Sequence, residues 1–438
     1  MSTILRLIYS VLLSALFPFI LIRMTYRYLS DKHGHRKAGP KRRFIERLGG
    51  FTSKPIDSLP PQLNGIVFHM VSVGETIAAI PLIEKFCAEH PDVPVTVTCT
   101  TPAGSKLITS KLASKVFHCY LPFDLPIFVH IFLARLQPRA LIILETELWP
   151  NLTHACFKRE IKTLVLNARL SQNSYEGYKK LSALTRGMMN EFSLICCQTQ
   201  ADADRFEKLG LDKAHYSVTG NLKFDISLDE HWLRKARLNG KTIFGNRPTW
   251  IAASTHEGEE RIVLDAHKAL LSTYPNLVLV LAPRHPERAH IAEGIAQELR
   301  LRCIKRTDKS LLNAQDSIYI VDTIGELMDF FAASQICLIC GSLVPHGGHN
   351  PLEPALLKKP ILTGKHVHNF TKIYDDLIAE NAAIKIEHSS TLEQNISPLL
   401  KNPEHRQELG NNAYAYLEKH RGATKFSLHE IDRIVCLN

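Results

Sequence analysis

The sequence predicts an α/β protein made of two consecutive Rossmann-like halves, each built on a parallel sheet. Its length of 438 residues exceeds what one hydrophobic core usually supports. Short apolar runs alternate with helical patterns, which is typical of a parallel sheet covered by helices on both faces. The alternation pauses once, in the polar and charge-rich stretch from Asp225 to Pro248, and then begins again. Two domains joined by one linker account for all three observations.

The apolar runs place five strands in each half. The first five are expected at residues 66–71, 93–99, 141–144, 163–166 and 194–197. The second five are expected at residues 250–253, 277–281, 318–321, 336–340 and 360–362. Helical patterns at 76–87, 127–136 and 202–209 separate or follow the strands of the first half. Ligands of such sheets bind beyond the carboxyl ends of the strands, so we expect the active site in a cleft between the halves.

Residues 7–22 form an uncharged apolar run between Arg6 and Arg23, and we interpret residues 1–24 as a membrane anchor. A cleavable signal peptide is the alternative, with Arg6 as its positive region. The uncleaved anchor is preferred because dense positive charge follows the run and no small-residue cleavage site does.

The segment from Arg23 to Arg47 holds nine Lys or Arg residues against Asp31 and Glu46, so most of the formal net charge of +10 lies there. Lysines and arginines that directly follow a membrane-spanning run lie near the membrane surface and attract anionic lipid headgroups. The positive-inside rule then places the rest of the chain in the cytoplasm. A nucleic-acid patch is the alternative interpretation, and the position of the charge beside a membrane run favours lipid over nucleic acid.

The expected domains are therefore an anchor at 1–24, a Rossmann-like domain at 25–225, a linker at 226–248 and a second Rossmann-like domain at 249–438. Ten cysteines without framework spacing indicate a reducing compartment, and we interpret all ten as small core residues. The Asp202-Ala203-Asp204 stretch lies in a helical pattern, where residues two apart face different directions, and is interpreted as solvated surface.

Polar residues follow six of the predicted strands. Glu75 lies after the first strand, where a helix-stabilising residue in the first turn is the alternative interpretation. Glu145 follows an apolar strand, where an unpaired carboxylate is costly, so it should have a partner. Gly347 and Gly348 precede a helix start at Pro351, which predicts a phosphate seat formed by free helix amides. His285, His346 and His349 lack the spacing of metal ligands.

Seven stretches together resemble the 3-deoxy-D-manno-oct-2-ulosonic acid (Kdo) transferases, along the whole chain. They are SVGET at 72–76, ETELWPN at 145–151, NARLS at 167–171, GNLKFD at 220–225, STHEGEE at 254–260, PRHPER at 283–288 and GGHNPLE at 347–353. The resemblance implies the GT-B fold, with two Rossmann-like domains facing a central cleft. It also implies an inverting glycosyltransferase that moves Kdo from CMP-Kdo to lipid IVA, the lipid A precursor of lipopolysaccharide, without a metal or other cofactor.

The resemblance assigns roles to individual residues. It implies that Glu75 is the general base, and that Glu145 and Lys223 stabilise the transition state. For Lys223 the alternative is an ordinary solvated lysine, and for Arg284 it is a surface ion pair. The donor contacts that the resemblance implies are Pro283, Arg284, Ile324, Gly325, Glu326, Asn350, Pro351, Leu352 and Glu353, with Glu353 accepting from the ribose hydroxyls.

Two alternative functions remain open from the sequence. One is another GT-B enzyme, either a different lipid glycosyltransferase or a sugar-nucleotide epimerase. The other is a membrane-anchored nucleotide or glycan binder without catalysis.

Overall fold

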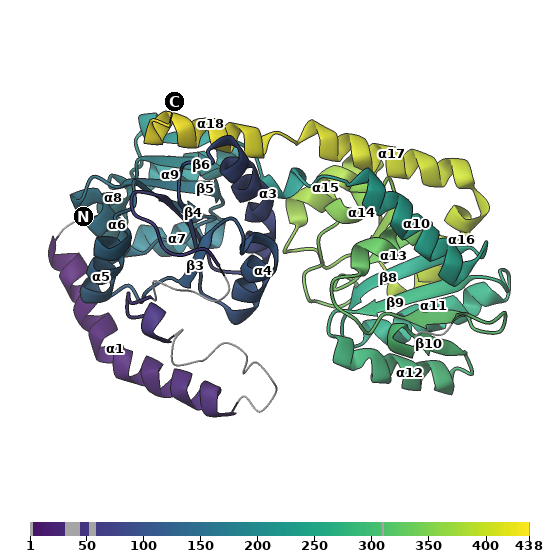
Figure 1. The fold of residues 1–438 in the computed structure, drawn as a ribbon. Helices are drawn as coiled ribbons and strands as arrows, with labels where there is room; N and C mark the ends of the chain where they lie inside the picture. Colours follow the sequence, from purple (N-terminus) through teal and green to yellow (C-terminus); the bar gives the residue numbers. More distant parts are fainter. Residues whose placement is uncertain (1–2, 31–43, 52–57, 309–310, 438) are drawn as a thin grey trace. The chain divides into compact units, whose positions relative to one another are not determined.

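The computed structural model describes residues 3–30, 44–51, 58–308 and 311–437 (Figure 1). The chain forms two compact units. The first comprises Met1–Asp225 and Arg421–Asn438, and the second comprises Ile226–His420. Each unit contains its own seven-stranded sheet, and every strand pairing in both sheets is parallel. The predicted fold class, two parallel-sheet α/β domains, is therefore confirmed.

The first sheet has the strand order β3-β2-β1-β4-β5-β6-β7. Its strands are β1 (Ile66–Met70), β2 (Val95–Cys99), β3 (Phe117–Tyr120), β4 (Ala140–Leu144), β5 (Lys162–Ala168), β6 (Leu194–Cys197) and β7 (Tyr216–Val218). The central strands are buried along their whole length because helices cover both faces. The order reverses between β1 and β4, and this switch point is where Rossmann-like sheets bind ligands.

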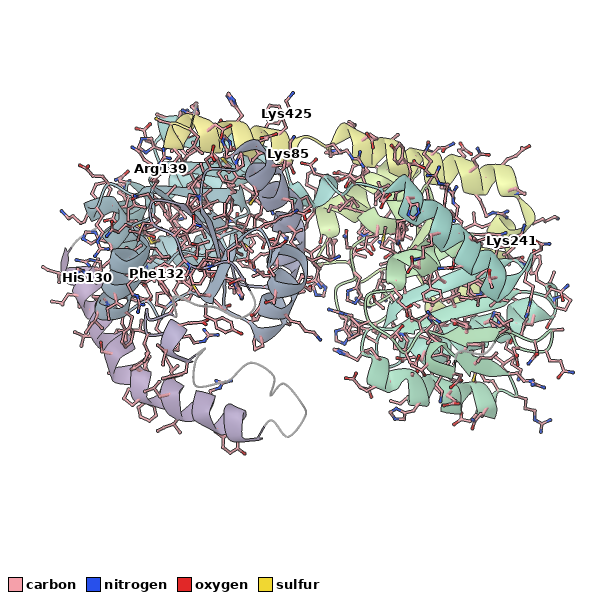
Figure 2. All side chains as sticks on the ribbon, in the orientation of Figure 1. Lys85, His130, Phe132, Arg139, Lys241 and Lys425 are labelled. Atoms are coloured by element: carbon pink, nitrogen blue, oxygen red, sulfur yellow. The ribbon has the colours of Figure 1, made fainter. Side chains whose placement is uncertain are left out.

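Two layers of helices cover the first sheet. One core cluster contains residues of β1 together with α3 (Val73–Glu89), α4 (Pro102–Leu112) and α18 (Ala423–Val435). The other contains α5 (Pro126–Leu136), α6 (Pro150–Lys158), α8 (Ser182–Met189) and α9 (Gln200–Lys208), with tyrosines of α7 (Gln172–Lys180) packed against it. In Figure 2 the buried Phe132 lies within this unit, whereas the exposed Lys241 of the second unit points outward.

The last eighteen residues pack on the first unit, although the sequence analysis placed them in the second domain. The apolar face of α18, including Leu428 and Ile431, joins the core beside α3. The Asp225 carboxylate accepts the backbone N–H of Gly422 at 2.7 Å and also that of Thr424, at the start of α18. The position of α18 is thus set by apolar burial and by one capping carboxylate, and neither partner is adjacent in sequence.

The second sheet has the order β10-β11-β9-β8-β12-β13-β14, with its switch point between β8 and β12. Its strands are β8 (Thr249–Thr255), β9 (Val278–Pro283), β10 (Cys303–Lys305), β11 (Ile318–Ile320), β12 (Ile336–Ile339), β13 (Ile361–Gly364) and β14 (Ala383–Ile386). Its helices are α10 (Glu230–Phe244), α11 (Glu259–Leu271), α12 (Ala289–Glu298), α13 (Leu327–Ala333), α14 (Leu352–Leu356), α15 (Thr371–Ala379), α16 (Leu392–Lys401) and α17 (Pro403–Lys419). Short 3₁₀ turns lie at Lys213–His215, Leu222–Phe224, Pro286–Arg288, Arg306–Asp308 and Ser389–Thr391.

The stretch expected as a linker, 226–248, carries helix α10 of the second unit. Phe244 of α10 is buried, and its ring lies 5.5 Å from that of Tyr319. Gly240 approaches Ala333 of α13 so closely that an added Cβ would lie 2.5 Å from the alanine methyl group. The polar composition of this stretch reflects the solvated face of an amphipathic helix.

Helix α1 (Thr3–Ser30) includes an apolar stretch, Ile4–Arg23, that is long enough to cross a membrane by length and composition. Phe17 packs at 5.4 Å from the rings of Phe123 and Phe128, and the buried Ser10 donates to the Asn151 side chain at 3.0 Å. The opposite face exposes large apolar side chains, including Phe19 at 69%. Most of the predicted basic segment, residues 31–43, lies outside the described residues.

All ten predicted strands are present, and four further strands, β3, β7, β10 and β14, were not predicted. Three of these four are short or only partly buried edge strands, which produce a weak apolar signal. All ten cysteines are free thiols. The prediction that all are core residues is wrong for Cys436, which is exposed in the turn that ends α18, and Cys87 and Cys303 are only partly buried.

Candidate functional site

Glu75 lies in the first turn of α3, directly after β1 at the switch point of the first sheet. Its backbone N–H donates to Ser72 Oγ at 3.2 Å, and its Oε2 accepts the Val71 N–H at 2.6 Å. These two bonds form a capping arrangement that fixes the carboxylate relative to the strand end. Burial raises the pKa of Glu75 in spite of these bonds, and the charge of Glu145 adds to the effect. Glu75 is therefore both a capping residue and a carboxylate with increased basicity.

Glu145 follows β4, the strand that pairs with β1 across the switch point. Its φ of 57° lies in the left-handed region, which is uncommon for a residue other than glycine and is found at functional sites. Lys223 Nζ donates to Glu145 Oε1 at 3.0 Å, and both side chains are a little over a quarter exposed. Lys223 is thus not a free surface lysine. It is the partner that we expected for Glu145, because an unpaired carboxylate after an apolar strand is costly.

Glu147 joins these groups, although the sequence analysis gave it no role. The pKa of Glu147 is raised to about 7. Burial is the largest cause of this shift, and the charges of Glu75 and Glu145 follow. Burial and the charge of Glu147 also raise the pKa of Tyr178. Its place two residues after Glu145 in a strand-end motif was a signal that could have identified it. Three carboxylates and one lysine therefore lie together at the switch point.

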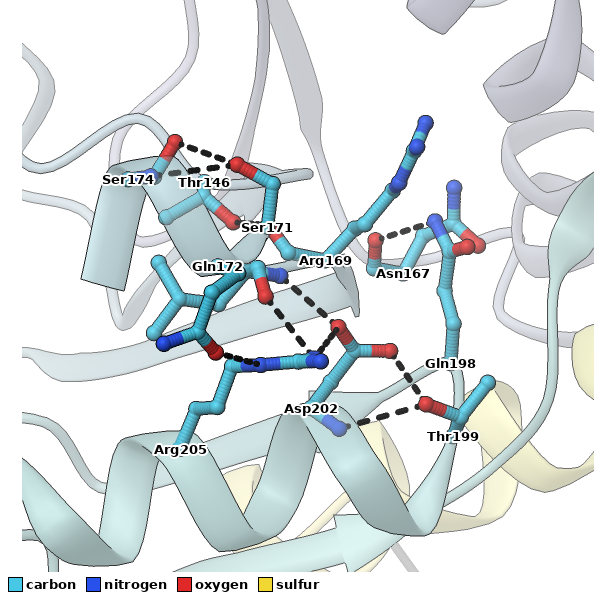
Figure 3. Close-up of polar contacts among 11 residues, drawn as sticks. Thr146, Asn167, Arg169, Ser171, Gln172, Ser174, Gln198, Thr199, Asp202 and Arg205 are labelled. Carbon is cyan, nitrogen blue, oxygen red and sulfur yellow. Dashed lines mark hydrogen bonds and ion pairs between the residues drawn. The ribbon is translucent and has the colours of Figure 1, made fainter. Parts of the chain in front are cut away.

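The loop that carries Lys223 is positioned by Asn167 of β5, whose side-chain oxygen accepts the Leu222 N–H at 3.0 Å. Gln198 in turn donates to the Asn167 carbonyl at 3.0 Å, as Figure 3 shows. Asn167 also has a left-handed φ of 56°, beside an irregularity in the β5–β6 register. The strained backbone at Asn167 and Glu145 thus occurs at the ends of two neighbouring strands.

The interpretation of Asp202 as solvated surface is wrong, because this residue is only 5% exposed. Its carboxylate accepts hydrogen bonds from the Leu170 N–H at 2.9 Å and from the Thr199 hydroxyl at 2.5 Å, and Figure 3 shows the contact with Thr199. Arg205 contributes an ion pair at 3.4 Å. Asp204 is exposed, so the two carboxylates diverge as the helical spacing predicts. Asp202 is a structural residue that joins β5 to α9.

Arg284 follows β9 in the second unit, and the buried Pro283 ends that strand. The Arg284 N–H donates to the Thr255 carbonyl at 3.0 Å, and its side chain is exposed. Within the described part of the chain its guanidinium has no carboxylate partner, so the alternative of a surface ion pair is not supported. Glu326, in contrast, is held by Arg306 at 2.9 Å next to the exposed Ile324 and Gly325. That pairing lowers the pKa of Glu326.

The glycine loop at Gly347 and Gly348 has positive φ at both glycines, as a tight turn requires. The helix that follows, α14, is only five residues long and begins after Pro351. Pro351 and Pro354 have no amide hydrogen, and the Leu352 N–H donates to Asn350 Oδ1 at 3.1 Å. Three of the four residues at this helix start therefore have no N–H for a ligand, contrary to the expected phosphate seat of helix amides.

Glu353 is partly buried, and burial alone raises the pKa of its carboxyl group. No hydrogen bond or ion pair to its carboxylate occurs among the described residues, which leaves two oxygen acceptors for a ligand. This geometry suits an acceptor for vicinal hydroxyls.

A second set of backbone amides, at Gly341, Ser342 and Leu343 after β12, is occupied by a carboxylate of the protein. Glu259 accepts these three N–H groups at 2.7, 3.1 and 2.9 Å, and it accepts a fourth from His256 at 2.9 Å. The Glu259 side chain is fully buried. These amides therefore fix the ends of β8 and β12 and are not open to an external anion.

Four histidines surround this strand end. His256 Nε2 lies 2.9 Å from His349 Nε2, and the His256 ring stacks on that of His346 with centroids 3.8 Å apart. The ring of His285 lies 6.2 Å from that of His256. Across residues 3–30, 44–51, 58–308 and 311–437, no group of three or more His, Cys, Asp or Glu side chains has an arrangement that could hold a metal ion.

The two sites have different chemical capacities. The carboxylates of the first unit can accept a proton and favour positive charge at a reacting carbon. The cationic and imidazole groups of the second unit, with the unpaired carboxylate of Glu353, suit a ligand that carries an anionic group and vicinal hydroxyls.

A sequence profile described as 3-deoxy-D-manno-octulosonic-acid transferase (kdotransferase) matches residues 42–226. A 3-deoxy-D-manno-octulosonic acid transferase of Haemophilus influenzae is 41% identical over 386 residues, which cover 87% of this chain and 89% of that protein. A probable mitochondrial 3-deoxy-D-manno-octulosonic acid transferase of Arabidopsis thaliana is 31% identical, covering 90% of this chain and 87% of that protein.

Among solved structures, the UDP-GlcNAc 2-epimerase of Neisseria meningitidis bound to UDP-GlcNAc is similar with a TM-score of 0.59. The match covers 84% of this chain and 100% of that one, at 15% identity. This similarity concerns the fold alone, two parallel-sheet domains of the GT-B type.

Proposed function

The chain belongs to the 3-deoxy-D-manno-octulosonic acid transferase family, and we propose that it transfers Kdo from CMP-Kdo to lipid IVA with inversion at the anomeric carbon. It is a Kdo transferase and hence a glycosyltransferase. The proposal adds the donor, the acceptor and the stereochemistry. The observation that carries it is the buried carboxylate of Glu75 at the switch point of the first sheet, which accepts the Val71 N–H while the Glu75 backbone N–H donates to Ser72 Oγ.

We assign to Glu75 the role of general base. In the proposed reaction an acceptor hydroxyl oxygen bonds to the anomeric carbon while the bond from that carbon to the phosphate oxygen breaks. The hydroxyl proton passes to Glu75, and CMP leaves with the bonding electron pair. A carboxylate with raised pKa is a stronger base than one in water, which supports this assignment.

Glu145 and Lys223 are proposed to stabilise the transition state. Positive charge develops at the anomeric carbon as the bond to phosphate lengthens, and the Glu145 carboxylate favours that charge. Lys223, whose Nζ lies 3.0 Å from Glu145 Oε1, orients the carboxylate. Lys223 also supplies a cation for the carboxylate of Kdo or for the departing phosphate.

The donor is proposed to bind the second unit. Arg284 has an unpaired fork of donors for the phosphate, and Glu353 has free oxygens for the ribose hydroxyls. Pro283, Ile324, Gly325, Glu326, Asn350, Pro351 and Leu352 complete the proposed donor contacts. Glu326 reaches a ligand only if its pair with Arg306 adjusts. The reaction is proposed to need no metal, so chelation by EDTA should leave the rate unchanged.

We propose an inner-membrane location with both units on the cytoplasmic face. The exposed apolar face of α1 over Ile4–Arg23 and the basic segment that follows it support this location. Lipid IVA is itself a membrane lipid, so anchoring keeps the enzyme in the layer that contains its acceptor.

The proposal is tested by incubating the purified full-length protein in detergent with CMP-Kdo and lipid IVA and weighing the product. Wild-type protein should add at least one Kdo residue. Glu75→Gln keeps an oxygen acceptor for the Val71 N–H but cannot take a proton, so transfer should fall about a hundredfold to ten-thousandfold. Glu89→Gln, an exposed position on the same helix, is the matched control and should keep full activity.

Three other results would contradict the proposal. Full activity of Glu75→Gln would exclude it as the base. Binding of CMP-Kdo by wild-type protein without transfer would indicate a binding protein. Conversion of a sugar nucleotide in the absence of any acceptor would indicate an epimerase.

A further inference from the structure

The switch point of the second sheet places a hydrogen-bonded pair of imidazoles where an anion is expected. His256 follows β8, and the loop that carries His349 follows β12, the two strands that flank the switch point. Rossmann-like sheets bind ligands at this point. The Nε2 atoms of His256 and His349 lie 2.9 Å apart. The pair is therefore at the position of the donor, but the proposed donor contacts do not include it.

Several backbone amides in this region already have partners within the protein and are not available to an anion. The amides of Gly341, Ser342 and Leu343 are taken by Glu259, and the start of α14 is poor in free N–H groups. We therefore look to side chains for the positive charge that holds an anion. Arg284 is one of them, and the imidazoles around it are the others.

The pair can hold one additional proton. In the neutral pair one ring donates its Nε2–H to the Nε2 lone pair of the other ring, so the donating ring has an unprotonated Nδ1. A proton on that Nδ1 converts the donor into an imidazolium and strengthens the bond between the rings. A second extra proton would need the lone pair that this bond already uses. The capacity of the pair is thus one proton.

The surroundings keep the free pair neutral. Burial, followed by the cationic forms of His346, His285 and Arg284, lowers the pKa of His256 to about 4. Burial, followed by the charges of His256, Arg284, His346 and His285, lowers the pKa of His349 to about 4. The charge of Glu260 opposes this for His256, but Glu260 is already paired with Arg288 at 3.0 Å. An anion placed among these groups would remove the repulsion that disfavours the proton.

Gly341 preserves the space for the two rings. Its φ is +70°, and an added Cβ would lie 3.0 Å from the His349 ring and 3.3 Å from His256. The carbonyl oxygen of His349 accepts the hydroxyl of the fully buried Tyr374 at 2.8 Å. The pair is therefore fixed by the fold.

We propose that the His256–His349 pair takes up one proton from solvent when the anionic group of the donor binds, and that the resulting shared cation helps Arg284 to hold that group. The proposal rests on the proposed function, because it takes the ligand to be a cytidine phosphate. Both histidines would be recognition residues, and binding would be linked to pH. Affinity should rise as pH falls, by up to about tenfold per pH unit for one coupled proton.

The probe is the methyl ester of CMP, a phosphodiester that does not titrate near neutral pH, and cytidine is the uncharged comparison. Calorimetric titrations of the full-length protein in buffers of different ionisation enthalpy, between about pH 8 and about pH 5.5, give the number of protons taken up. We expect uptake of up to one proton for the ester and none for cytidine.

The variants His256→Gln and His349→Gln should lose the uptake and bind the ester with an affinity independent of pH. The exposed His405→Gln, on α17, is the matched control and should behave as wild type. Circular dichroism and the melting temperature verify that each variant is folded. If a variant fails to fold, the wild-type uptake and the ester-against-cytidine difference still decide the question.

Binding of the ester without proton uptake would overturn this inference and leave the proposed donor site intact. Uptake that persists in both histidine variants would also overturn it. Failure of the ester and of CMP-Kdo to bind wild-type protein would overturn the proposed function together with the inference.

Discussion

Replacement of Glu147 by Gln should stabilise the first unit at alkaline pH and have little effect at acid pH. Burial and the charges of Glu75 and Glu145 raise the pKa of Glu147 from 4.5 to about 7. A carboxyl group with a raised pKa in the folded chain favours folding while it is protonated. Its ionisation destabilises the fold as pH rises from the unfolded to the folded pKa. Glutamine has no such ionisation, so this loss should disappear.

The size of the effect follows from the same pKa difference. A shift from 4.5 to about 7 corresponds in full to about 3 kcal/mol. Because the Glu147 side chain is only partly buried, solvent screening reduces this to about 1–2 kcal/mol. For a unit of this size each kcal/mol changes the melting temperature by about 2–4 °C. The variant should therefore melt about 2–8 °C above wild type at pH well above 7.

Differential scanning calorimetry of wild type and Glu147→Gln at about pH 5 and about pH 8.5 measures this difference. Glu89→Gln, which removes an exposed carboxylate at a surface ion pair, is the control and should show almost no pH-dependent difference. Equal melting shifts of Glu147→Gln at both pH values would refute the reasoning. If Glu147→Gln melted below wild type at alkaline pH, the ionised Glu147 carboxylate would stabilise the fold, which is the opposite of the expected effect.

Three further changes test other parts of the structure. Lys223→Met removes the partner of Glu145 and should lower the rate of Kdo transfer by about tenfold to a thousandfold in the mass assay. Lys223→Arg should be less affected. An unchanged rate in Lys223→Met would exclude a catalytic role for the Lys223–Glu145 pair. Asp225→Asn weakens the cap of α18 and should reduce the stability of this helix by about 1–2 kcal/mol. Limited proteolysis should then release the C-terminal helix faster than in wild type. Equal protection from the protease would contradict the capping role. Gly341→Ala forces a side chain against His349 at positive φ and should weaken binding of CMP by at least about tenfold. The first unit, which contains Glu75, should keep its melting transition. Wild-type affinity for CMP would show that the loop tolerates the change.

Much of the fold was predictable because buried parallel strands are continuous apolar runs. The runs at 66–71 and 336–340, for example, correspond to β1 and β12, which are buried on both faces. The edge strands β10 and β14 are short and partly exposed, so they have no comparable pattern. Helix α10 was hidden because its solvated face made the stretch 226–248 resemble a linker.

The candidate site was predictable to the extent that it lies at strand ends. Glu75, Glu145 and Arg284 were singled out for that reason, and each lies directly after a strand near a switch point or beside one. Glu147 was not given a role, because its raised pKa arises from neighbours that only folding brings together. The expected phosphate seat at the start of α14 depended on helix length and on free amides, and neither can be counted from motif spacing.

The sequence by itself determined the family, the two parallel sheets and the residue types at their strand ends, since hydrophobic periodicity and motif order are local properties of the chain. Only the tertiary structure decided which of those residues meet. The pairing of Lys223 with Glu145, the docking of α18 on the first unit and the contact between His256 and His349 each join segments more than seventy residues apart. Such contacts depend on strand order and on the burial of both partners, and neither is encoded in any single stretch of sequence.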